Sequence, residues 1–213
     1  MLGLGLRAPL GTLLCLGAHS DDAEIGCGGT VLRLLEEHPA AHVVWVVLAA
    51  SGERREEAVA SARRLLGNAS CEIVVEAFRD GFLPHDSVRV KERFEALKEA
   101  VSPDLILTHT RDDMHQDHRL VNELTWNTWR SHLILEYEIP KVDGDLGRPN
   151  LYVPLTAEQV ERKVAHLLEA FPSQRGKHWF DAELFRGLMR LRGMEAVSPS
   201  GYAEAFVARK LVL

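Results

Sequence analysis

The chain has 213 residues, of which 46% are hydrophobic and 26% are charged, and its formal net charge at pH 7 is −6. This length and composition are typical of one globular, soluble domain that can bury a sizeable core. The acidic balance argues against a nucleic-acid binder, because phosphate contacts need clustered lysines and arginines. No apolar run approaches the roughly 20 residues that a membrane span needs. The three cysteines lack the spacing of a disulfide framework, which fits the reducing cytoplasm.

Apolar, strand-like runs alternate with helix-like segments through residue 135. Strands are expected at 12–17, 41–48, 73–75 and 104–108, and helices at 31–37, 54–66 and 88–101. Near-continuous apolar runs are typical of strands that are buried on both faces of a parallel sheet. We therefore predict an α/β fold whose core, residues 1–135, is a Rossmann-like, doubly wound, mostly parallel sheet.

Beyond residue 135 the alternation becomes irregular. Strands are expected at 134–140, 151–155 and 203–208, and helices from Thr156 to about Phe171 and from Asp181 to Arg192, ending at Gly193. Thr156 is a typical N-cap residue, and the proline in 151–155 suits an edge strand. Residues 136–213 are predicted to form a C-terminal α+β cap or sheet extension that shapes a substrate pocket, within one domain of residues 1–213.

Polar segments follow two of the predicted strands. Residues 18–30 read AHSDDAEIGCGGT, and residues 109–118 read HTRDDMHQDH. Because the carboxyl ends of parallel strands meet at one edge of a sheet, both segments are expected side by side. His19, Asp22 and His118 can then meet at one metal ion, and this nitrogen and oxygen ligand set suits zinc with an open position.

The neighbouring polar residues suggest hydrolytic chemistry. Asp21 would crowd the metal if it bound together with Asp22, so Asp21 is predicted to be the general base for a water molecule. His115 is placed to stabilise an oxyanion and, as an imidazolium, to protonate a departing amine. Asp117 is predicted to orient a histidine, with His115 as the first choice. The remaining polar residues of this loop are expected to line the entrance, namely His109, Asp112 and Asp113.

Each segment also has a simpler interpretation. Asp21 and Asp22 could serve the N-terminus of the following helix, and a single loop histidine is usually a surface residue. Glu24 is either a partner of the helix dipole or a residue that orients a ligand. Cys27 could be a fourth ligand, although a small packing residue is the favoured interpretation. The occurrence of both segments directly after apolar strands favours the metal site.

The two segments resemble the LmbE-like or PIG-L family of zinc-dependent N-deacetylases. That family carries Ala-His-Pro-Asp-Asp-x-Glu-x-Gly-x-Gly-Gly-Thr, which residues 18–30 match at every fixed position except the proline, where Ser20 stands. Its second motif, His-x-Asp-His, is matched by residues 115–118, and weaker similarity extends to 53–67, 79–81 and 202–206. The resemblance implies a zinc-dependent hydrolase that removes an acetyl group from an N-acetylated amino sugar or glycoconjugate of the N-acetylglucosamine type.

The resemblance also implies how the substrate is bound. An arginine after Glu53, either Arg54 or Arg55, and Asp80 are expected to face the hydroxyl groups of a sugar. The substrate would be a small N-acetyl sugar or glycoconjugate, and the family implies a homo-oligomer. The same ligands would also accept other divalent transition metals such as Fe²⁺ or Co²⁺.

Three alternatives remain open from the sequence. The first is a metal-dependent amidase that acts on a non-sugar amide or a thiol conjugate. The second is a relative that binds metal without useful catalysis. The third is a nucleotide-binding protein, which is weakly supported because the pair Gly28 and Gly29 lacks the first glycine of a G-x-G-x-x-G fingerprint.

Overall fold

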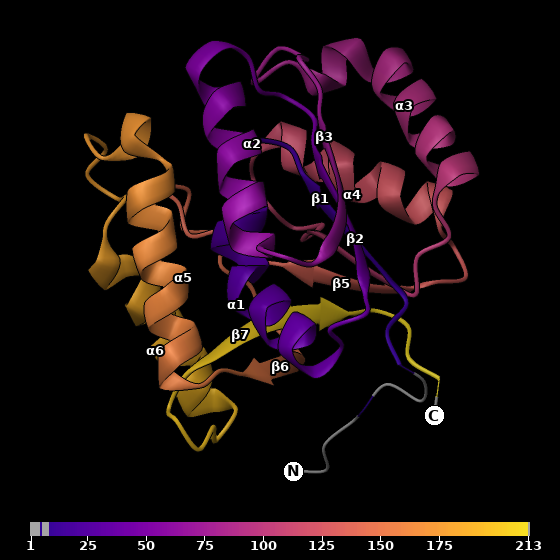
Figure 1. Ribbon diagram of the computed structural model, residues 1–213. Helices are drawn as coiled ribbons and strands as arrows, with labels where there is room; N and C mark the ends of the chain where they lie inside the picture. The colour runs from indigo at the N-terminus through magenta and orange to yellow at the C-terminus, as the bar shows by residue number, and fades with distance from the viewer. Residues whose placement is uncertain (1–4, 6–8, 213) are drawn as a thin grey trace.

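One seven-stranded sheet lies at the centre of the molecule, in the order β3-β2-β1-β4-β5-β7-β6 (Figure 1). The computed structural model describes residue 5 and residues 9–212. The strands are β1 (Thr12–Gly17), β2 (His42–Val47), β3 (Ser70–Val75), β4 (Leu105–His109), β5 (Leu133–Tyr137), β6 (Leu151–Pro154) and β7 (Ala203–Ala208). The helices are α1 (Asp22–Glu37), α2 (Gly52–Leu66), α3 (Ser87–Ala100), α4 (Gln116–Thr128), α5 (Ala157–Ala170) and α6 (Ala182–Glu195), with 3₁₀ turns η1 (Leu83–Asp86) and η2 (Pro172–Gln174).

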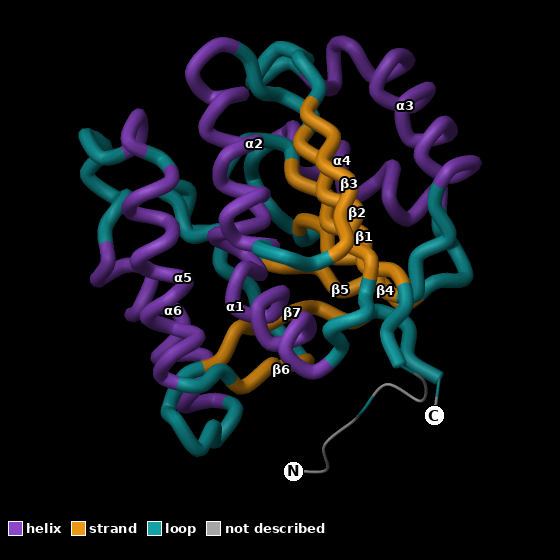
Figure 2. The backbone as a smooth tube through the Cα atoms, viewed as in Figure 1, coloured by secondary structure: helices purple, strands orange, loops and turns teal. Residues whose placement is uncertain are grey.

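The first five strands form a parallel, doubly wound sheet. β3, β2, β1, β4 and β5 pair in parallel with their neighbours, and β1 and β2 are buried along all but their first residue. Helices α1, α2, α5 and α6 pack against one face, and α3 and α4 pack against the other (Figure 2). The predicted α/β class and its Rossmann-like order are therefore confirmed.

The C-terminal residues continue the same sheet. β7 pairs antiparallel with both β5 and β6, so β6 and its proline lie at the edge, as predicted. Thr156 caps α5 through a capping box, in which its hydroxyl accepts from the Gln159 amide at 3.2 Å and its own amide donates to Gln159 Oε1 at 2.9 Å. The division into a core and a C-terminal extension stays a prediction.

Helix α1 begins at Asp22 rather than at residue 31, which corrects the prediction. The polar, glycine-rich segment is typical of a loop, but tertiary packing makes it helical. A Cβ atom on Gly26 would lie 2.2 Å from the Tyr137 ring, so glycine lets this part of α1 lie directly on the sheet.

Two smaller predictions are also wrong. Helix α6 continues through Gly193 to Glu195, because a Cβ on Gly193 would lie 2.1 Å from the Gly201 carbonyl oxygen and the glycine serves close packing rather than termination. Cys71 lies in a strand-like run, which predicts a core position, but it is exposed on the edge strand β3. Cys27 is buried, and its thiol donates to the Ala23 carbonyl at 3.1 Å, as the packing interpretation expects. Among the described residues, no helix is both long enough and apolar enough to cross a membrane.

Candidate metal centre and active-site cleft

The two polar segments meet at the switch point of the sheet. β1 and β4 are neighbouring parallel strands, α1 follows the carboxyl end of β1, and α4 follows that of β4. Connections on either side of this pair run to opposite faces of the sheet, which leaves a crevice where ligands bind in folds of this kind. The prediction that both segments emerge side by side is confirmed by the topology.

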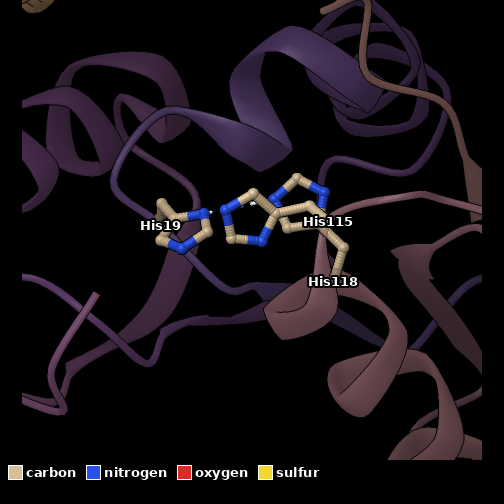
Figure 3. Close-up of side chains that lie close together, drawn as sticks. All are labelled: His19, His115 and His118. Atoms are coloured by element: carbon tan, nitrogen blue, oxygen red, sulfur yellow. Dashed lines mark hydrogen bonds between the residues drawn. The ribbon is translucent and has the colours of Figure 1, made fainter. Parts of the chain in front are cut away.

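The structure brings the three predicted ligands together. His19 Nδ1 lies 3.1 Å from His118 Nε2 and 3.3 Å from Asp22 Oδ2, and His118 Nε2 lies 3.5 Å from Asp22 Oδ1. Figure 3 shows the rings of His19 and His118 turned toward each other. Ligands at zinc bond lengths in a tetrahedron stand about 3.3–3.5 Å apart. The separation of His19 and His118 is close to this value, and the Asp22 carboxylate lies beside both rings through different oxygens. Two groups that could hold a metal ion share His118 and divide the predicted ligands between them, namely His19 with His115 and His118, and Asp22 with His109 and His118.

Carboxylates hold the outer nitrogens of both ligand histidines. His118 Nδ1 lies 2.9 Å from Asp113 Oδ2, while His19 Nε2 lies 3.2 Å from Asp117 Oδ2 and 3.1 Å from Asp80 Oδ1. A carboxylate can only accept, so each outer nitrogen carries a hydrogen, and in the neutral ring the inner nitrogen is then free to bind a metal ion. Two inner ring nitrogens and the Asp22 carboxylate thus converge on one point.

Asp117 contacts a histidine as expected, but that histidine is His19 and not the first choice, His115. Its carboxylate contacts His19, and it also accepts the amide hydrogens of Gly81 at 2.8 Å and Leu83 at 3.1 Å. It does not orient His115, which contacts only the backbone N–H of Asp117. The spacing within the motif could not reveal this, because α4 points the Asp117 side chain toward the other segment.

The charges at this point favour a cation. Burial lowers the pKa of His19, but the carboxylates of Asp22, Asp117 and Asp80 outweigh burial and raise that pKa well above its ordinary value. Burial raises the pKa of Asp22, but the three histidines His118, His109 and His19 outweigh it and hold that pKa well below its usual range. Positive charge is therefore stabilised where the three predicted ligands meet.

Asp21 has different surroundings from its neighbour. It is the N-cap residue of α1 but makes no side-chain cap hydrogen bond, and its Oδ1 instead lies 2.9 Å from Arg54 Nη2. Asp21 therefore does not cap α1 through its side chain, although it stands at the N-terminus of that helix. Burial raises its pKa although Arg54 opposes the shift, and a raised pKa brings a carboxylate nearer to the range of an effective general base.

His115 caps α4 with its ring. Its Nδ1 accepts the backbone N–H of Asp117 at 3.2 Å, so the neutral ring carries its hydrogen on Nε2. The ring stacks on His118 at 4.6 Å between centroids and meets the edge of His19 at 4.8 Å (Figure 3). Burial, together with the charges of His118 and His19, lowers the pKa of His115, which favours the neutral ring.

An open cleft of about 690 Å³ surrounds these groups, and the proposed ligands lie in its wall together with Asp21 and His115. Both the core and the C-terminal residues line it, including Arg54, Asp80, Lys141, Lys177 and Trp179. Arg55 donates instead to the Val75 carbonyl and is not part of the wall. Of the two adjacent arginines, Arg54 is therefore the one that faces the cleft.

Two residues that were expected to line the entrance are buried. Asp113 holds His118, as described above, and its pKa lies below its usual range because hydrogen bonds and charge from His118 and Lys141 outweigh burial. His109 lies beneath the centre, with Nε2 3.1 Å from Asp22 Oδ2 and its ring stacked on His118 at 3.8 Å. Burial and the nearby His118 lower the pKa of His109 to about 4. Their burial depends on tertiary packing, which no sequence pattern shows.

Glu24 follows neither of its two interpretations. It is fully buried, and its Oε1 accepts from the Ser61 hydroxyl at 2.5 Å, which in turn lies 2.8 Å from His166 Nε2 on α5. Burial raises the pKa of Glu24 to about 8. Glu24 thus joins α1 to α2 and α5 as an uncharged group near pH 7.

Comparison with known proteins gives the family. Residues 14–129, more than half of the chain, match the PIG-L family, described as GlcNAc-PI de-N-acetylase. The chain belongs to the PIG-L family. Members of this family are hydrolytic N-deacetylases, so the predicted class of enzyme is confirmed at the level of the family. A search of curated proteins gives no match.

Three solved structures with 17–21% sequence identity share the fold of this PIG-L chain. N,N′-diacetylchitobiose deacetylase from Pyrococcus horikoshii is 21% identical, with a TM-score of 0.73 over 93% of this chain and 84% of that chain. The zinc-inhibited form of teicoplanin deacetylase Orf2 is 17% identical, with a TM-score of 0.69 over 92% and 97%. The 4-carboxy-2-hydroxymuconate hydratase GalB from Pseudomonas putida is 20% identical, with a TM-score of 0.71 over 95% and 98%.

Proposed function

We propose that this PIG-L protein is a zinc-dependent hydrolase that removes the acetyl group from an N-acetylated amino sugar or glycoconjugate. The observation that carries the proposal is the convergence of two imidazole nitrogens and one carboxylate at His19, His118 and Asp22. Two ring nitrogens 3.1 Å apart beside a carboxylate form a place where a positive charge, either a shared proton or a metal ion, is held. A nitrogen and oxygen donor set of this kind suits zinc and also accepts Fe²⁺.

The reaction uses Asp21 as the base. A bound zinc ion would polarise the acetyl carbonyl and lower the pKa of a coordinated water molecule. Asp21 takes one proton from the attacking water, whose oxygen forms the new bond to the carbonyl carbon. The proton that Asp21 accepted passes to the nitrogen, the C–N bond breaks, and acetate and a free amine leave, which returns Asp21 to its ionised form. Arg54 keeps the Asp21 carboxylate in place through their 2.9 Å contact.

His115 supports the charge that develops on the carbonyl oxygen. The cap bond from the Asp117 amide occupies Nδ1, so the hydrogen on Nε2 is the one that His115 can donate. An imidazolium would have to give up that cap bond, because a protonated Nδ1 cannot accept. The structure therefore supports oxyanion stabilisation, and proton delivery from His115 to the amine stays a prediction.

The sugar is assigned to the open part of the cleft. Arg54 and Asp80 lie in its wall and present groups that pair with hydroxyls. Two of the structural neighbours are named N,N′-diacetylchitobiose deacetylase and teicoplanin deacetylase, which supports the choice of reaction. A third neighbour is a hydratase, so the fold alone does not select the reaction.

The test pairs metal analysis with product analysis. Purified protein is analysed for bound metals, and acetate release is measured with N-acetylglucosamine, N,N′-diacetylchitobiose and non-sugar N-acetyl amides. About one zinc per chain and chelator-sensitive release from the sugars alone are expected. Release from the non-sugar amides only would favour the amidase alternative, and metal without any release would favour a non-catalytic relative. Protein that takes up no metal would refute the centre.

A further inference from the structure

Glu57 on α2 is a buried carboxylate that the proposed reaction does not use. Its Oε1 accepts the backbone N–H of Ser173 at 2.8 Å. Its Oε2 accepts the Ser173 hydroxyl at 2.6 Å and Arg54 Nη1 at 2.9 Å. Only 7% of the residue is exposed, and the pKa of Glu57 lies below its usual value because these hydrogen bonds outweigh burial. Both oxygens of the carboxylate are thus committed.

Arg54 is held between two carboxylates. One terminal nitrogen contacts Asp21 and the other contacts Glu57, while the guanidinium carbon lies 5.5 Å from the centroid of the Phe171 ring. The contact to Asp21 uses a single nitrogen, so by itself it would leave the guanidinium free to rotate. The second contact, to Glu57, fixes the plane of the guanidinium and therefore the direction from which Arg54 meets Asp21.

The same carboxylate fixes one wall of the cleft. Ser173 lies in η2, and the residues after it include three that line the cleft, Gln174, Lys177 and Trp179. The Gln174 side-chain amide donates to the Ser173 hydroxyl at 2.9 Å. This wall belongs to the C-terminal residues, whereas Asp21 and Arg54 belong to the Rossmann-like core. Glu57 joins the two across 116 positions of sequence.

We propose that Glu57 is a positioning residue, a role that rests on the proposed function of the site. Its carboxylate holds Arg54 against Asp21 and holds the cleft wall at Ser173, so one side chain sets both the direction of the base and the position of the wall. None of its contacts among the described residues is to His19, Asp22 or His118. Glu57 therefore acts on the reaction through Arg54 and not through the metal centre.

The kinetic test compares Glu57→Gln with a matched control. Glu161→Gln removes an equivalent charge from a carboxylate that pairs with Arg186 at 2.6 Å outside the cleft. With N,N′-diacetylchitobiose as the probe, Glu57→Gln is expected to lower kcat about tenfold and to change KM less than about threefold, because a misdirected base slows the reaction more than binding. Glu161→Gln should keep both constants. If Glu57→Gln lowers the Tm but leaves kcat unchanged, Glu57 has only a structural role, and that result overturns the inference.

A second variant separates the wall from the base. Ser173→Ala removes the hydroxyl, which accepts a long 3.3 Å bond from Arg54 Nη1, but it leaves the Arg54–Glu57 pair, the Arg54–Asp21 contact and the Ser173 backbone bond in place. It is expected to raise KM about threefold or more with little change in kcat. An equal loss of kcat in Ser173→Ala and Glu57→Gln would contradict the separate roles. Ser173→Ala also carries the test if Glu57→Gln does not fold.

Crystal structures of the wild-type protein and Glu57→Gln test the inference independently of enzyme activity. In Glu57→Gln, Arg54 Nη2 is expected to leave Asp21 Oδ1, with a separation beyond about 3.5 Å, and the wall from Ser173 to Trp179 is expected to shift. An unchanged Arg54–Asp21 contact would refute the inference. If the wild-type protein releases no acetate from any probe, the proposed function fails, while these structures still decide the role of Glu57.

Discussion

Asp21 and Asp22 are adjacent carboxylates whose surroundings assign them different tasks. Asp22 faces three histidines, which hold its pKa below its usual range, so it stays ionised. Asp21 is buried beside Arg54, and burial raises its pKa. Two aspartates therefore supply a predicted ligand and a predicted base. Asp22 faces the histidines, whereas Asp21, one position earlier, faces Arg54 on α2.

Asp21→Asn is predicted to separate metal binding from turnover. The amide keeps the size of the side chain but cannot take up a proton, so kcat should fall about a hundredfold or more. Bound metal, measured by elemental analysis, should remain at the wild-type level. Retained turnover in Asp21→Asn would show that another group is the base.

Asp113→Asn tests the partner that holds His118. The asparagine accepts the ring hydrogen less well, so metal affinity should fall about 10- to 100-fold, as measured by competition with a chromogenic chelator. Asp112→Asn is the matched control, because Asp112 is the preceding residue and is exposed. Equal affinities in the two variants would refute the role given to Asp113.

At the scale of the secondary-structure elements, α1 is the helix that sets the centre against the sheet. Its N-terminus carries the first ligand segment, and Gly26 lets it lie against the ring of Tyr137. The Tyr137 hydroxyl donates to the Leu16 carbonyl at 2.7 Å and lies 3.2 Å from His109 Nε2. The packing of α1 on Tyr137 therefore affects His109, which lies beneath the predicted ligands.

Gly26→Ala and Gly28→Ala form a matched pair on this helix. The added methyl on Gly26 would overlap the Tyr137 ring, whereas on Gly28 its closest neighbour, Lys163, lies 3.8 Å away. Gly26→Ala is expected to lower the free energy of unfolding by about 1–3 kcal/mol. Gly28→Ala is expected to be neutral or to raise it by about 0.5–1 kcal/mol, because alanine favours a helix. Urea unfolding measures the free energy of unfolding of both variants. Equal values would argue against the close packing of α1 on Tyr137.

The junction of α2 and α5 should make stability depend on pH. Burial lowers the pKa of His166 to about 4, whereas an unfolded histidine has a pKa near 6.5. The unfolded chain therefore binds more protons between these values, and the free energy of unfolding should fall as the pH drops from about 6.5 to 4. The loss assigned to His166 is at most about 3 kcal/mol.

His166→Gln isolates this contribution from that of Glu24. Glu24 has a raised pKa of about 8, so its contribution has the opposite sign and is lost as the pH rises through about 4.5 to 8. Urea unfolding of both proteins across pH 4–7 gives the difference. The difference in the free energy of unfolding between wild type and His166→Gln should become smaller as the pH falls. A constant difference would mean that His166 is not buried in its neutral form.

At the scale of the whole molecule, one sheet carries both ligand segments, and the segment between α5 and α6 adds the C-terminal wall of the cleft. The predicted ligands come from residues almost a hundred positions apart, and they meet only in the folded chain. Metal binding should therefore stabilise the fold by mass action. The expected homo-oligomer stays a prediction, which light scattering of the purified protein tests.

Zinc is predicted to raise the Tm of metal-free protein. At a free concentration of a hundred times Kd the gain is about 2.7 kcal/mol, which for a chain of this size corresponds to about 5–10 °C. Differential scanning fluorimetry of dialysed protein with and without zinc gives the shift. His19→Ala should show little or none, and a full shift in that variant would place the ion elsewhere.

The sequence by itself determined the sheet, the positions of the two polar segments and the three predicted ligands. Local periodicity and the order of strands and helices carry that information, because parallel strands deliver their following loops to one edge. The helical start of α1 at Asp22, the partner of Asp117, the burial of His109 and Asp113, and the choice of Arg54 over Arg55 were decided by tertiary structure. Each depends on which side chains from distant segments compete for the same donors and space, and that competition exists only once the chain is packed.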